Sequence, residues 1–281
     1  MKLGDFFLKP VTAGTLLLDG GAMFGVVPRA LWSRTNPADD NNRIDMNMRI
    51  LYIEGKGRKI VIDSGAGTKL GEKMVRNYGV RCKDLKDLFK SEGLDPGSVT
   101  DVISTHLHFD HAGGLTRYNE DGELVLTFPN ARHYIQKKQW EAAFHPNEKD
   151  RASFFEENYL PVEKEGKLSL VEGEKEIIPG VKLIPTEGHT PGHQIILVKS
   201  PEGNLLYCGD LIPLASHINL PYIMAYDHFP LTTLREKKEI LARAADEGWI
   251  LFFEHDPVIA ACKVKRNERG RFEISRQVDM E

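Results

Sequence analysis

The chain has 281 residues, of which 41% are hydrophobic and 28% charged, and its formal net charge is −4. This composition is typical of a globular protein, and the length allows one large domain over residues 1–281. No basic block indicates a nucleic-acid surface, and no apolar run is long enough to span a membrane. We therefore expect neither nucleic acid nor a membrane as a partner.

The cysteines and the first residues indicate a cytoplasmic protein. Cys82, Cys208 and Cys262 are widely spaced and odd in number, which is typical of reduced thiols. Residues 1–11 carry charges and no long apolar core, so they predict no signal peptide.

The first elements in the chain are a strand and an apolar segment without a period. Residues 16–18 begin a strand that ends at Asp19-Gly20-Gly21. Residues 22–34 carry large apolar side chains around Gly25 and Pro28, with neither helical nor strand spacing. We predict a loop here that either folds onto the core or borders a pocket.

Regular patterns follow. Residues 46–52 alternate as a strand, residues 54–57 form a hairpin turn, and residues 59–63 form the returning strand. Residues 68–78 and 83–91 are predicted helices.

The densest set of metal-ligating residues comes next. Residues 100–105 predict a short buried strand, and His106, His108, Asp110 and His111 follow within six positions. In an extended segment, residues two apart point the same way, so the first two histidines can reach one metal ion. Asp110 and His111 come after the chain turns and can reach a second point. Imidazole and carboxylate suit zinc, and also iron, cobalt or manganese.

The run His106-x-His108-x-Asp110-His111 resembles the HxHxDH signature of the metallo-β-lactamase-fold hydrolases. That resemblance implies an α+β protein with an αββα sandwich, in which two mixed sheets are flanked by helices. It also implies a histidine, an aspartate and a histidine as ligands downstream. Asp63-Ser64-Gly65 resembles the family's DxG segment, in which the aspartate orients a metal-bound histidine. A turn or a helix cap is the alternative for Asp63.

The middle of the chain mixes helices and strands. Predicted strands cover residues 131–136, 168–171, 176–178 and 181–185, and predicted helices cover residues 137–144 and 151–159. His133 and His145 lie in no ligand-like context, and we expect them to be ordinary surface or packed residues.

The downstream ligands are found by the resemblance. Gly188-His189-Thr190-Pro191-Gly192-His193 resembles the third family motif, in which His189 matches the ligand. We expect His193 to play a structural role at the base of the turn. Asp210 follows a strand over residues 205–208 and matches the bridging carboxylate. In an extended strand Cys208 would share the side of Asp210, and we interpret it as a core thiol.

The last part of the chain closes the fold. We predict a helix over residues 232–247, capped by Thr232, and a strand over residues 249–253. His255 follows that strand and matches the last family ligand. Residues 258–264 and 271–275 predict a closing hairpin.

Seven candidate ligands divide into two sites by resemblance. The first site comprises His106, His108 and His189, the second comprises Asp110, His111 and His255, and Asp210 bridges them. Two divalent ions at such sites share a water and lower its pKa, which yields a hydroxide nucleophile. Asp210 and Asp110 are the candidate catalytic residues, because Asp210 bridges and Asp110 could also move a proton.

The substrate is inferred from the lactonases of this family. HLHFDHAGG, HTPGH and the placement of Asp210 and His255 resemble acyl-homoserine (quorum-quenching) lactonases, which implies opening of a lactone or ester. Those enzymes typically carry a tyrosine three residues after the bridging aspartate, where this chain has Pro213. The candidate pocket residues, some of which could replace that tyrosine, are Met23, Phe24, Trp32, Tyr222, Tyr226 and His228.

Other functions stay open at this stage. The same metals serve phosphotriester hydrolases and glyoxalase II-type thioester hydrolases, although few basic side chains lie between residues 211 and 234 to bind an anionic thiol. A non-enzymatic metal-binding protein is the alternative from another class. We expect a small-molecule substrate with an apolar arm, and a homodimer is left open.

Overall fold

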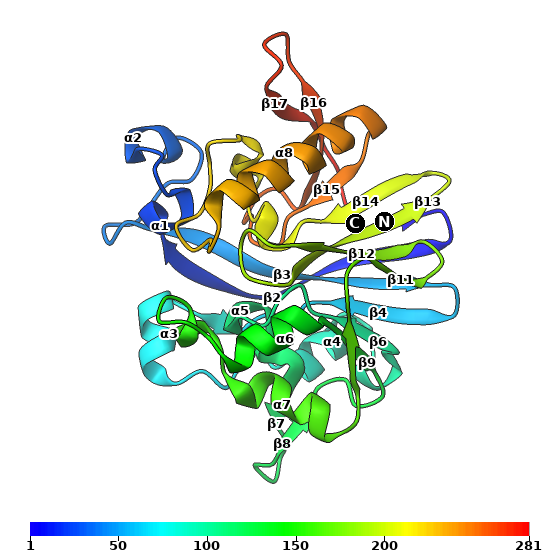
Figure 1. The fold of residues 1–281 in the computed structure, drawn as a ribbon. Helices are drawn as coiled ribbons and strands as arrows, with labels where there is room; N and C mark the ends of the chain where they lie inside the picture. Colours follow the sequence, from blue (N-terminus) through cyan, green and yellow to red (C-terminus); the bar gives the residue numbers. More distant parts are fainter. Residues whose placement is uncertain (281) are drawn as a thin grey trace.

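The computed structural model describes residues 1–280, and two β-sheets pack face to face with helices on both outer faces (Figure 1). The first sheet has the strand order β1-β2-β3-β4-β6-β9-β10, with β5 paired to β2. Its strands are β1 (Lys2–Leu3), β2 (Phe6–Asp19), β3 (Arg43–Gly55), β4 (Arg58–Ile62), β5 (Arg81–Cys82), β6 (Asp101–Ile103), β9 (Arg132–Gln136) and β10 (Leu168–Val171). This is the predicted αββα architecture.

The second sheet is built from residues 175–277 in the order β11-β12-β13-β14-β15-β16-β17. Its strands are β11 (Lys175–Ile178), β12 (Val181–Thr186), β13 (His193–Ser200), β14 (Gly203–Tyr207), β15 (Ile250–Phe252), β16 (Ala261–Arg266) and β17 (Phe272–Gln277). The pairs are antiparallel except β14 with β15, which is parallel and is connected through a helix.

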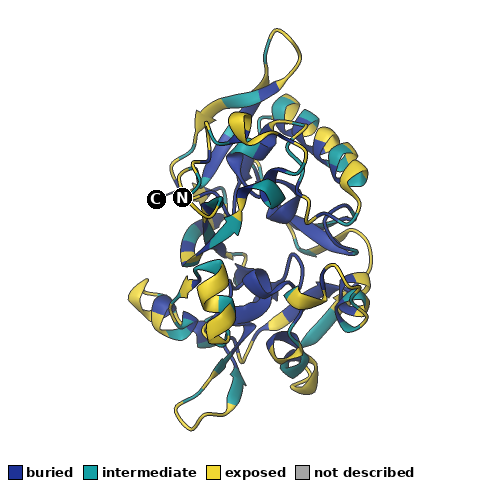
Figure 2. Cartoon of the chain, turned by 90° about the vertical axis from the view of Figure 1, so that its left-hand side faces the viewer, coloured by how far each residue is buried: buried dark blue, intermediate teal, exposed yellow. Residues whose placement is uncertain are grey.

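Each central strand is buried on both faces because a sheet covers one face and helices cover the other. In β13, Ile196 and Val198 pack between the two sheets, whereas Ile195 and Leu197 pack towards helix α8 (Pro230–Glu247). Successive side chains on a strand point to opposite faces. Because both faces of β13 are covered, its sequence is a continuous apolar run rather than an alternating one. Figure 2 shows the same division, with exposed residues on helix faces and loops.

The helices that flank the first sheet lie below it in Figure 1. These helices are α3 (Glu72–Tyr78), α4 (Leu85–Ser91), α5 (Phe109–Ala112), α6 (Lys137–Phe144) and α7 (Glu156–Lys164). The short helices α1 (Gly20–Phe24) and α2 (Arg29–Trp32) lie at the upper left of the same view. Short 3₁₀ turns cover Pro96–Ser98, Gly113–Leu115, Arg151–Ser153, Gly209–Leu211 and Ala215–Ile218. A separate hairpin joins β7 (Thr116–Tyr118) to β8 (Leu124–Leu126), which the sequence pattern did not predict.

Four predicted elements differ from the structure. The strand expected to begin at residue 16 is the end of β2, which begins at Phe6. Residues 22–34 are not an irregular loop but contain α1 and α2, which are too short to show a helical period. Residues 151–159 are not one helix but a 3₁₀ turn followed by α7. Helix α8 begins at Pro230 rather than behind a Thr232 cap, because proline fits the first helical position.

Within residues 1–280 we find no helix that is both long and apolar enough to cross a membrane.

Candidate metal centre

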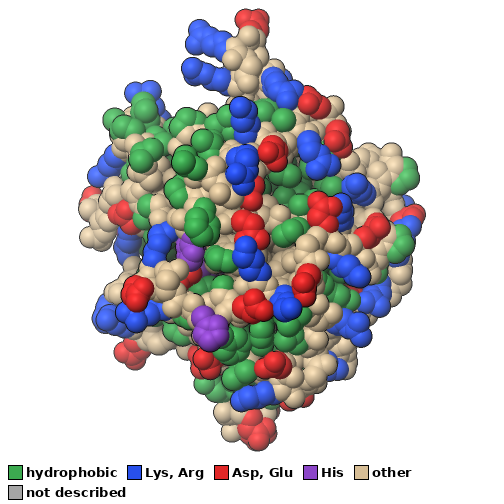
Figure 3. All heavy atoms as spheres, viewed as in Figure 1, with side chains coloured by type: hydrophobic (Ala, Val, Ile, Leu, Met, Phe, Trp, Pro, Cys, Tyr) green, Lys and Arg blue, Asp and Glu red, His purple; other side chains and the backbone are tan. Residues whose placement is uncertain are grey.

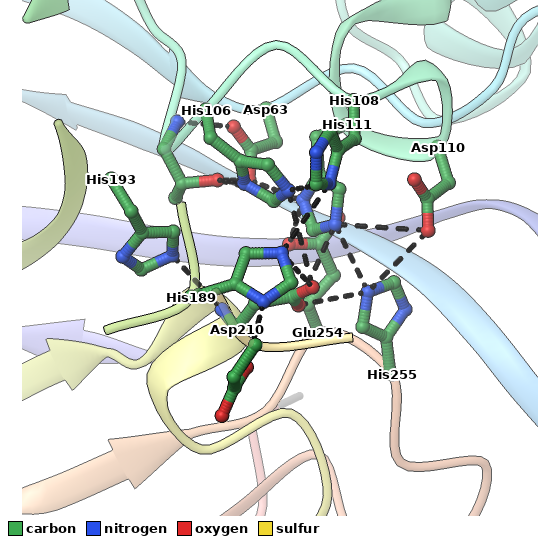
Figure 4. A network of polar contacts seen from close by, with 12 residues as sticks. Asp63, His106, His108, Asp110, His111, His189, His193, Asp210, Glu254 and His255 are labelled. Carbon is green, nitrogen blue, oxygen red and sulfur yellow. Dashed lines mark hydrogen bonds and ion pairs between the residues drawn. The ribbon is translucent and has the colours of Figure 1, made fainter. Parts of the chain in front are cut away.

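The seven predicted ligands meet at one edge of the sandwich, where strands from both sheets end (Figure 4). Four of them follow β6, one follows β12, one follows β14 and one follows β15. In this order they are His106, His108, Asp110, His111, His189, Asp210 and His255. The local chain is turned by the short helix α5, which places Asp110 and His111 beyond the two preceding histidines.

The first group consists of three imidazole nitrogens that converge. His108 Nδ1 lies 3.0 Å from His106 Nε2 and 3.3 Å from His189 Nε2. Three ring nitrogens that face one point cannot all be satisfied by hydrogen bonds to one another. A tetrahedral zinc ion with Zn–N bonds of about 2.0–2.1 Å would separate its ligand nitrogens by roughly 3.3 Å. The three residues therefore fit a metal ion.

The second group lies beside the first. His111 Nε2 is 3.1 Å from His255 Nε2, and Asp110 Oδ2 is 3.8 and 3.9 Å from these two nitrogens. Asp210 lies between the groups: its Oδ2 is 3.2 Å from His189 Nε2 and its Oδ1 is 3.2 Å from His255 Nε2. One carboxylate thus presents one oxygen to each group.

The far nitrogen of four ligand rings contacts a protein partner, and for His106 Nδ1 this is the Thr105 hydroxyl oxygen at 3.1 Å. His189 Nδ1 is 2.9 Å from Asp227 Oδ1, and His255 Nδ1 is 2.8 Å from the Asn47 carbonyl oxygen. His111 Nδ1 lies between two carboxylate oxygens, 3.1 Å from Asp63 and 3.0 Å from Glu254. Such contacts fix the ring orientation and leave the other nitrogen for a metal ion.

Asp63 is held in turn by the residue before the first ligand. Its carboxylate accepts from the Thr105 backbone N–H at 2.6 Å and from the Thr105 hydroxyl at 2.7 Å. Asp63 itself adopts φ 58°, a left-handed conformation that aspartate tolerates better than most residues. The structure places it against His111, the contact that the DxG resemblance implies.

Glu254 and Asp227 were not among the predicted site residues. Each immediately neighbours a histidine in the sequence, but the partners they contact are 143 and 38 positions away, at His111 and His189. No local spacing marks such pairs.

Burial and neighbouring charges shift the pKa values of the ligands in different directions. Burial lowers the pKa of His106 and His108 well below the usual histidine value, and neighbouring imidazoles lower it further. For His255, burial acts in the same direction, but the Asp210 carboxylate raises the pKa to about 9. Burial raises the pKa of Asp210, but His111 and His189 hold it well below the usual value. Burial also lowers the pKa of His111, but neighbouring carboxylates, Glu254 first, raise it well above the usual value. The neutral His106 and His108 and the ionised Asp210 are the forms that bind metal ions, whereas His111 and His255 would each release a proton on binding one.

Two flanking residues have structural contacts. His193 Nε2 accepts from the Asp210 backbone N–H at 3.1 Å, which matches its expected role at the base of the turn. Cys208 is buried in the core under α8. It does not share the side of Asp210, because β14 ends at Tyr207 and Gly209 takes φ 48° between the two residues.

A pocket opens onto both groups of ligands. Its lining residues are Leu18, Met23, Met46, Tyr78, His108, Phe109, Asp110, Lys149, Asp150, Ser153, His189, Asp210, Met224, Tyr226 and His255, and its cavity volume is about 80 Å³. Seven of the fifteen lining side chains are apolar or aromatic, five are candidate metal ligands, and the remaining three are Lys149, Asp150 and Ser153. Apolar walls around placed polar groups are typical of sites for small molecules.

Of the six predicted pocket residues, Met23 and Tyr226 line this cavity. The other four are not among its described lining residues. Phe24 is fully buried and stacks on Trp32, and Tyr222 meets the edge of Phe24. His228 Nε2 pairs with Asp150 Oδ2 at 2.8 Å.

Fold and site together define a hydrolase-type metal centre at the edge of an αββα sandwich. A family profile described as the Metallo-beta-lactamase superfamily matches residues 49–255, and the chain belongs to this superfamily of hydrolases. The predicted family and fold are thereby confirmed.

Several relatives carry more particular names. N-acyl homoserine lactonase AiiA of Bacillus thuringiensis subsp. kurstaki is 31% identical over 173 residues, which are 60% of this chain and 61% of the lactonase. N-acyl homoserine lactonase AttM of Rhizobium radiobacter is 26% identical over 86% of this chain and 92% of its own length. A solved structure from Staphylococcus aureus, named as a probable metal-dependent hydrolase, matches with TM-score 0.88 and 32% identity over 99% of this chain and 100% of its own.

Proposed function

We propose that the chain is a dinuclear metal-dependent hydrolase that opens a lactone or ester, with an N-acyl homoserine lactone-like substrate. The observation that carries the proposal is the Asp210 carboxylate, which lies 3.2 Å from a ligand histidine of each group. A carboxylate can bind one ion with each oxygen, which an imidazole cannot do. Zinc suits this donor set, with iron, cobalt or manganese as alternatives.

The ligand residues would hold two divalent ions close enough to share a water. Such a pair supplies a hydroxide nucleophile at neutral pH and polarises the carbonyl oxygen. Asp210 would fix the spacing of the two sites, and Asp110, which borders the pocket, could also accept a proton. No serine or cysteine nucleophile is then required, consistent with the burial of Cys208 in the core.

The pocket supports a neutral substrate with an apolar arm. Leu18, Met23, Met46 and Met224 line it, and methionine side chains adapt to arms of different shape. The named lactonase relatives support the acyl homoserine lactone class. On this proposal the partner is a small molecule rather than a nucleic acid or a membrane, and residues 1–281 act as one domain.

The position of the lactonase tyrosine offers no hydroxyl here. Pro213 instead accepts a hydrogen bond from the His255 backbone N–H through its carbonyl oxygen, at 3.2 Å. Tyr78 and Tyr226 are the phenols that line the pocket. We propose Tyr226, which comes from the segment after Asp210, as the group that assists the carbonyl oxygen.

The test is kcat/KM for a series of acyl lactones, measured beside a phosphotriester and a glutathione thioester on metal-analysed protein. Each buried methylene contributes about 0.8 kcal/mol, or about fourfold in kcat/KM. The gain should level off once the arm fills the pocket. A flat profile with faster phosphotriester turnover would replace the lactonase by a phosphotriester hydrolase on the same centre.

A further inference from the structure

His111 differs from the other ligand histidines because two carboxylates face its Nδ1. Glu254 Oε2 lies at 3.0 Å and Asp63 Oδ2 at 3.1 Å, and all three side chains are fully buried (Figure 4). An imidazole offers one hydrogen at Nδ1, so one acceptor would suffice to orient the ring. The second acceptor therefore calls for a separate explanation.

The two carboxylates hold His111 to different parts of the fold. Asp63 follows β4 of the first sheet and is anchored by Thr105, which belongs to the same half of the chain as His111. Glu254 follows β15 of the second sheet and directly precedes the ligand His255. Through Glu254, one ligand of the second group is thus connected to the segment that carries another.

The position of Glu254 is fixed by strand β3 and by Tyr207. The Arg49 backbone N–H donates to the Glu254 carbonyl oxygen at 3.1 Å, and Arg49 Nη1 donates to the carbonyl oxygens of Phe253 and Asp256 at 2.8 and 3.0 Å. The Tyr207 hydroxyl donates to Glu254 Oε2 at 2.7 Å. Neither backbone nor side chain of Glu254 can shift without breaking these bonds.

We propose that Glu254 is a positioning residue of the second metal group, which sets His111 and His255 at the separation that one shared ion requires. The contact to His111 Nδ1 keeps His111 Nε2 3.1 Å from His255 Nε2, although the two rings come from different sheets. Asp63 alone would orient the ring but not tie it to the His255 segment. This inference rests on the proposed dinuclear function.

The chain contains a matched control for the test. Asp227 makes the corresponding contact to His189 Nδ1 at 2.9 Å, but His189 belongs to the first group. Both carboxylates are buried and each lies one residue from a histidine. Removal of Glu254 should therefore lower the affinity for the second ion, and removal of Asp227 should lower the affinity for the first.

The experiment is a chelator titration of Glu254→Ala, Glu254→Gln, Asp227→Ala and the unsubstituted protein, with bound ions counted by elemental analysis. Proton NMR of the cobalt-substituted proteins, which resolves N–H protons of ligand imidazoles, would assign the ion that leaves. Glu254→Ala should bind the second ion about 10- to 100-fold more weakly and keep the first. Glu254→Gln should restore most of this loss, because the amide oxygen can accept from His111 Nδ1. Asp227→Ala should instead weaken the binding of the first ion.

Three results would overturn the inference. The first is wild-type retention of the second ion in Glu254→Ala. The second is a Glu254→Gln variant as defective as Glu254→Ala, which would show that charge rather than position matters. The third is an unsubstituted protein that binds only one ion, which would overturn the dinuclear proposal as well. Because the unsubstituted protein is measured separately, the two failures are distinguishable.

Discussion

At the scale of single residues, Cys208 and Asp210 show how two positions that strand alternation would place on one side can point to opposite sides. Gly209 makes the turn between them, and a side chain there would come 2.7 Å from His193 Nε2. As a consequence, the Cys208 thiol lies in the core below α8, and the Asp210 carboxylate lies at the metal centre.

Asp210→Ala should therefore lose hydrolysis far more than it loses folding. It removes the only proposed bridge between the two metal groups, and we expect a fall in kcat of at least about 100-fold with a near-native circular dichroism spectrum. Cys208→Ser is the control, with activity largely kept and a stability loss of about 1–3 kcal/mol for a buried hydroxyl. Metal loss in the serine variant but not in the alanine variant would refute the ligand assignment.

The phenol of Tyr226 provides a second prediction at this scale. Burial raises the pKa of Tyr226 well above the usual value, with contributions from Tyr78 and Asp110, so the phenol stays protonated and can donate. Tyr226→Phe should lower kcat/KM on lactones by about tenfold, the worth of one hydrogen bond of about 1.4 kcal/mol.

Tyr222→Phe serves as the control, since Tyr222 packs on Phe24 and does not line the cavity. If Tyr78→Phe alone produced the loss, Tyr78 would be the group that replaces the lactonase tyrosine.

Site residues that lie close together in the sequence could be predicted from their spacing, whereas those whose partners are far away in the sequence could not. His106, His108, Asp110 and His111 stand within six residues, so their spacing alone indicated a metal site. Glu254 could not be predicted in the same way, because its contact with His111 arises only when the two sheets pack.

At the scale of elements, strands with strong alternation or continuous apolar character were predicted well. The exact agreement of residues 137–144 with α6 and of residues 168–171 with β10 reflects clear local patterns. By contrast, α1 is five residues long and begins with a side-chain cap, in which Asp19 accepts from the Ala22 N–H at 2.8 Å. So short a helix is held by its cap and by tertiary packing, which a periodic pattern does not report.

The exposed part of this region forms an apolar surface. Val26 is 92% exposed beside α1, and hydrophobic side chains gather over α1 and α2 in Figure 3. The buried part, which includes Trp32, packs into the core instead. Because exposed and buried apolar residues are mixed in this segment, its apolar residues do not repeat with a helical period. The sequence pattern therefore did not indicate the two helices.

Helix α8 and the preceding segment are joined by Lys237, which allows a prediction about pH. The buried Lys237 Nζ donates to the carbonyl oxygens of Asn219 and Tyr222 at 3.1 and 2.6 Å, and burial lowers its pKa to about 7. An unfolded lysine titrates near 10.4, so between these values the unfolded chain binds more protons. Stability therefore rises with pH across this window.

Relative to Lys237→Met, the wild-type protein should gain up to about 1.4 kcal/mol of unfolding free energy per pH unit between about pH 7 and pH 10. Urea denaturation of both proteins at several pH values measures the difference. Lys237→Arg, which stays charged, would serve as a control without this slope. If the difference in unfolding free energy between the wild-type protein and Lys237→Met did not change with pH, the assignment of Lys237 as a neutral buried lysine would be wrong.

At the scale of the whole molecule, the metal centre lies at the edge of the sandwich where ligands from the two sheets meet. His106 and His111 come from the half of the chain that builds the first sheet, and His189 and His255 come from the half that builds the second. Apolar packing between the sheets and the contacts of β3 with residues 253–256 already hold the halves together. Bound ions would add cross-links at the open edge.

Metal removal should consequently destabilise the fold without abolishing it. A free ion concentration of 100 times Kd stabilises a protein by about 2.7 kcal/mol per site, so two independent sites contribute about 5 kcal/mol. At roughly 2 °C per kcal/mol for a chain of this size, the apo-protein should melt about 10 °C below the reconstituted protein. The sandwich core should still give a cooperative transition, because most of its apolar contacts lie away from the centre.

Differential scanning calorimetry of chelator-treated and reconstituted protein measures this shift. Asp210→Ala is the informative comparison: its apo-form should melt near the wild-type apo-form, but added metal should raise its Tm by a smaller amount. An unchanged Tm on reconstitution, with two ions demonstrably bound, would mean that the unfolded chain binds the ions as tightly as the folded protein does, and would contradict the proposed preformed centre.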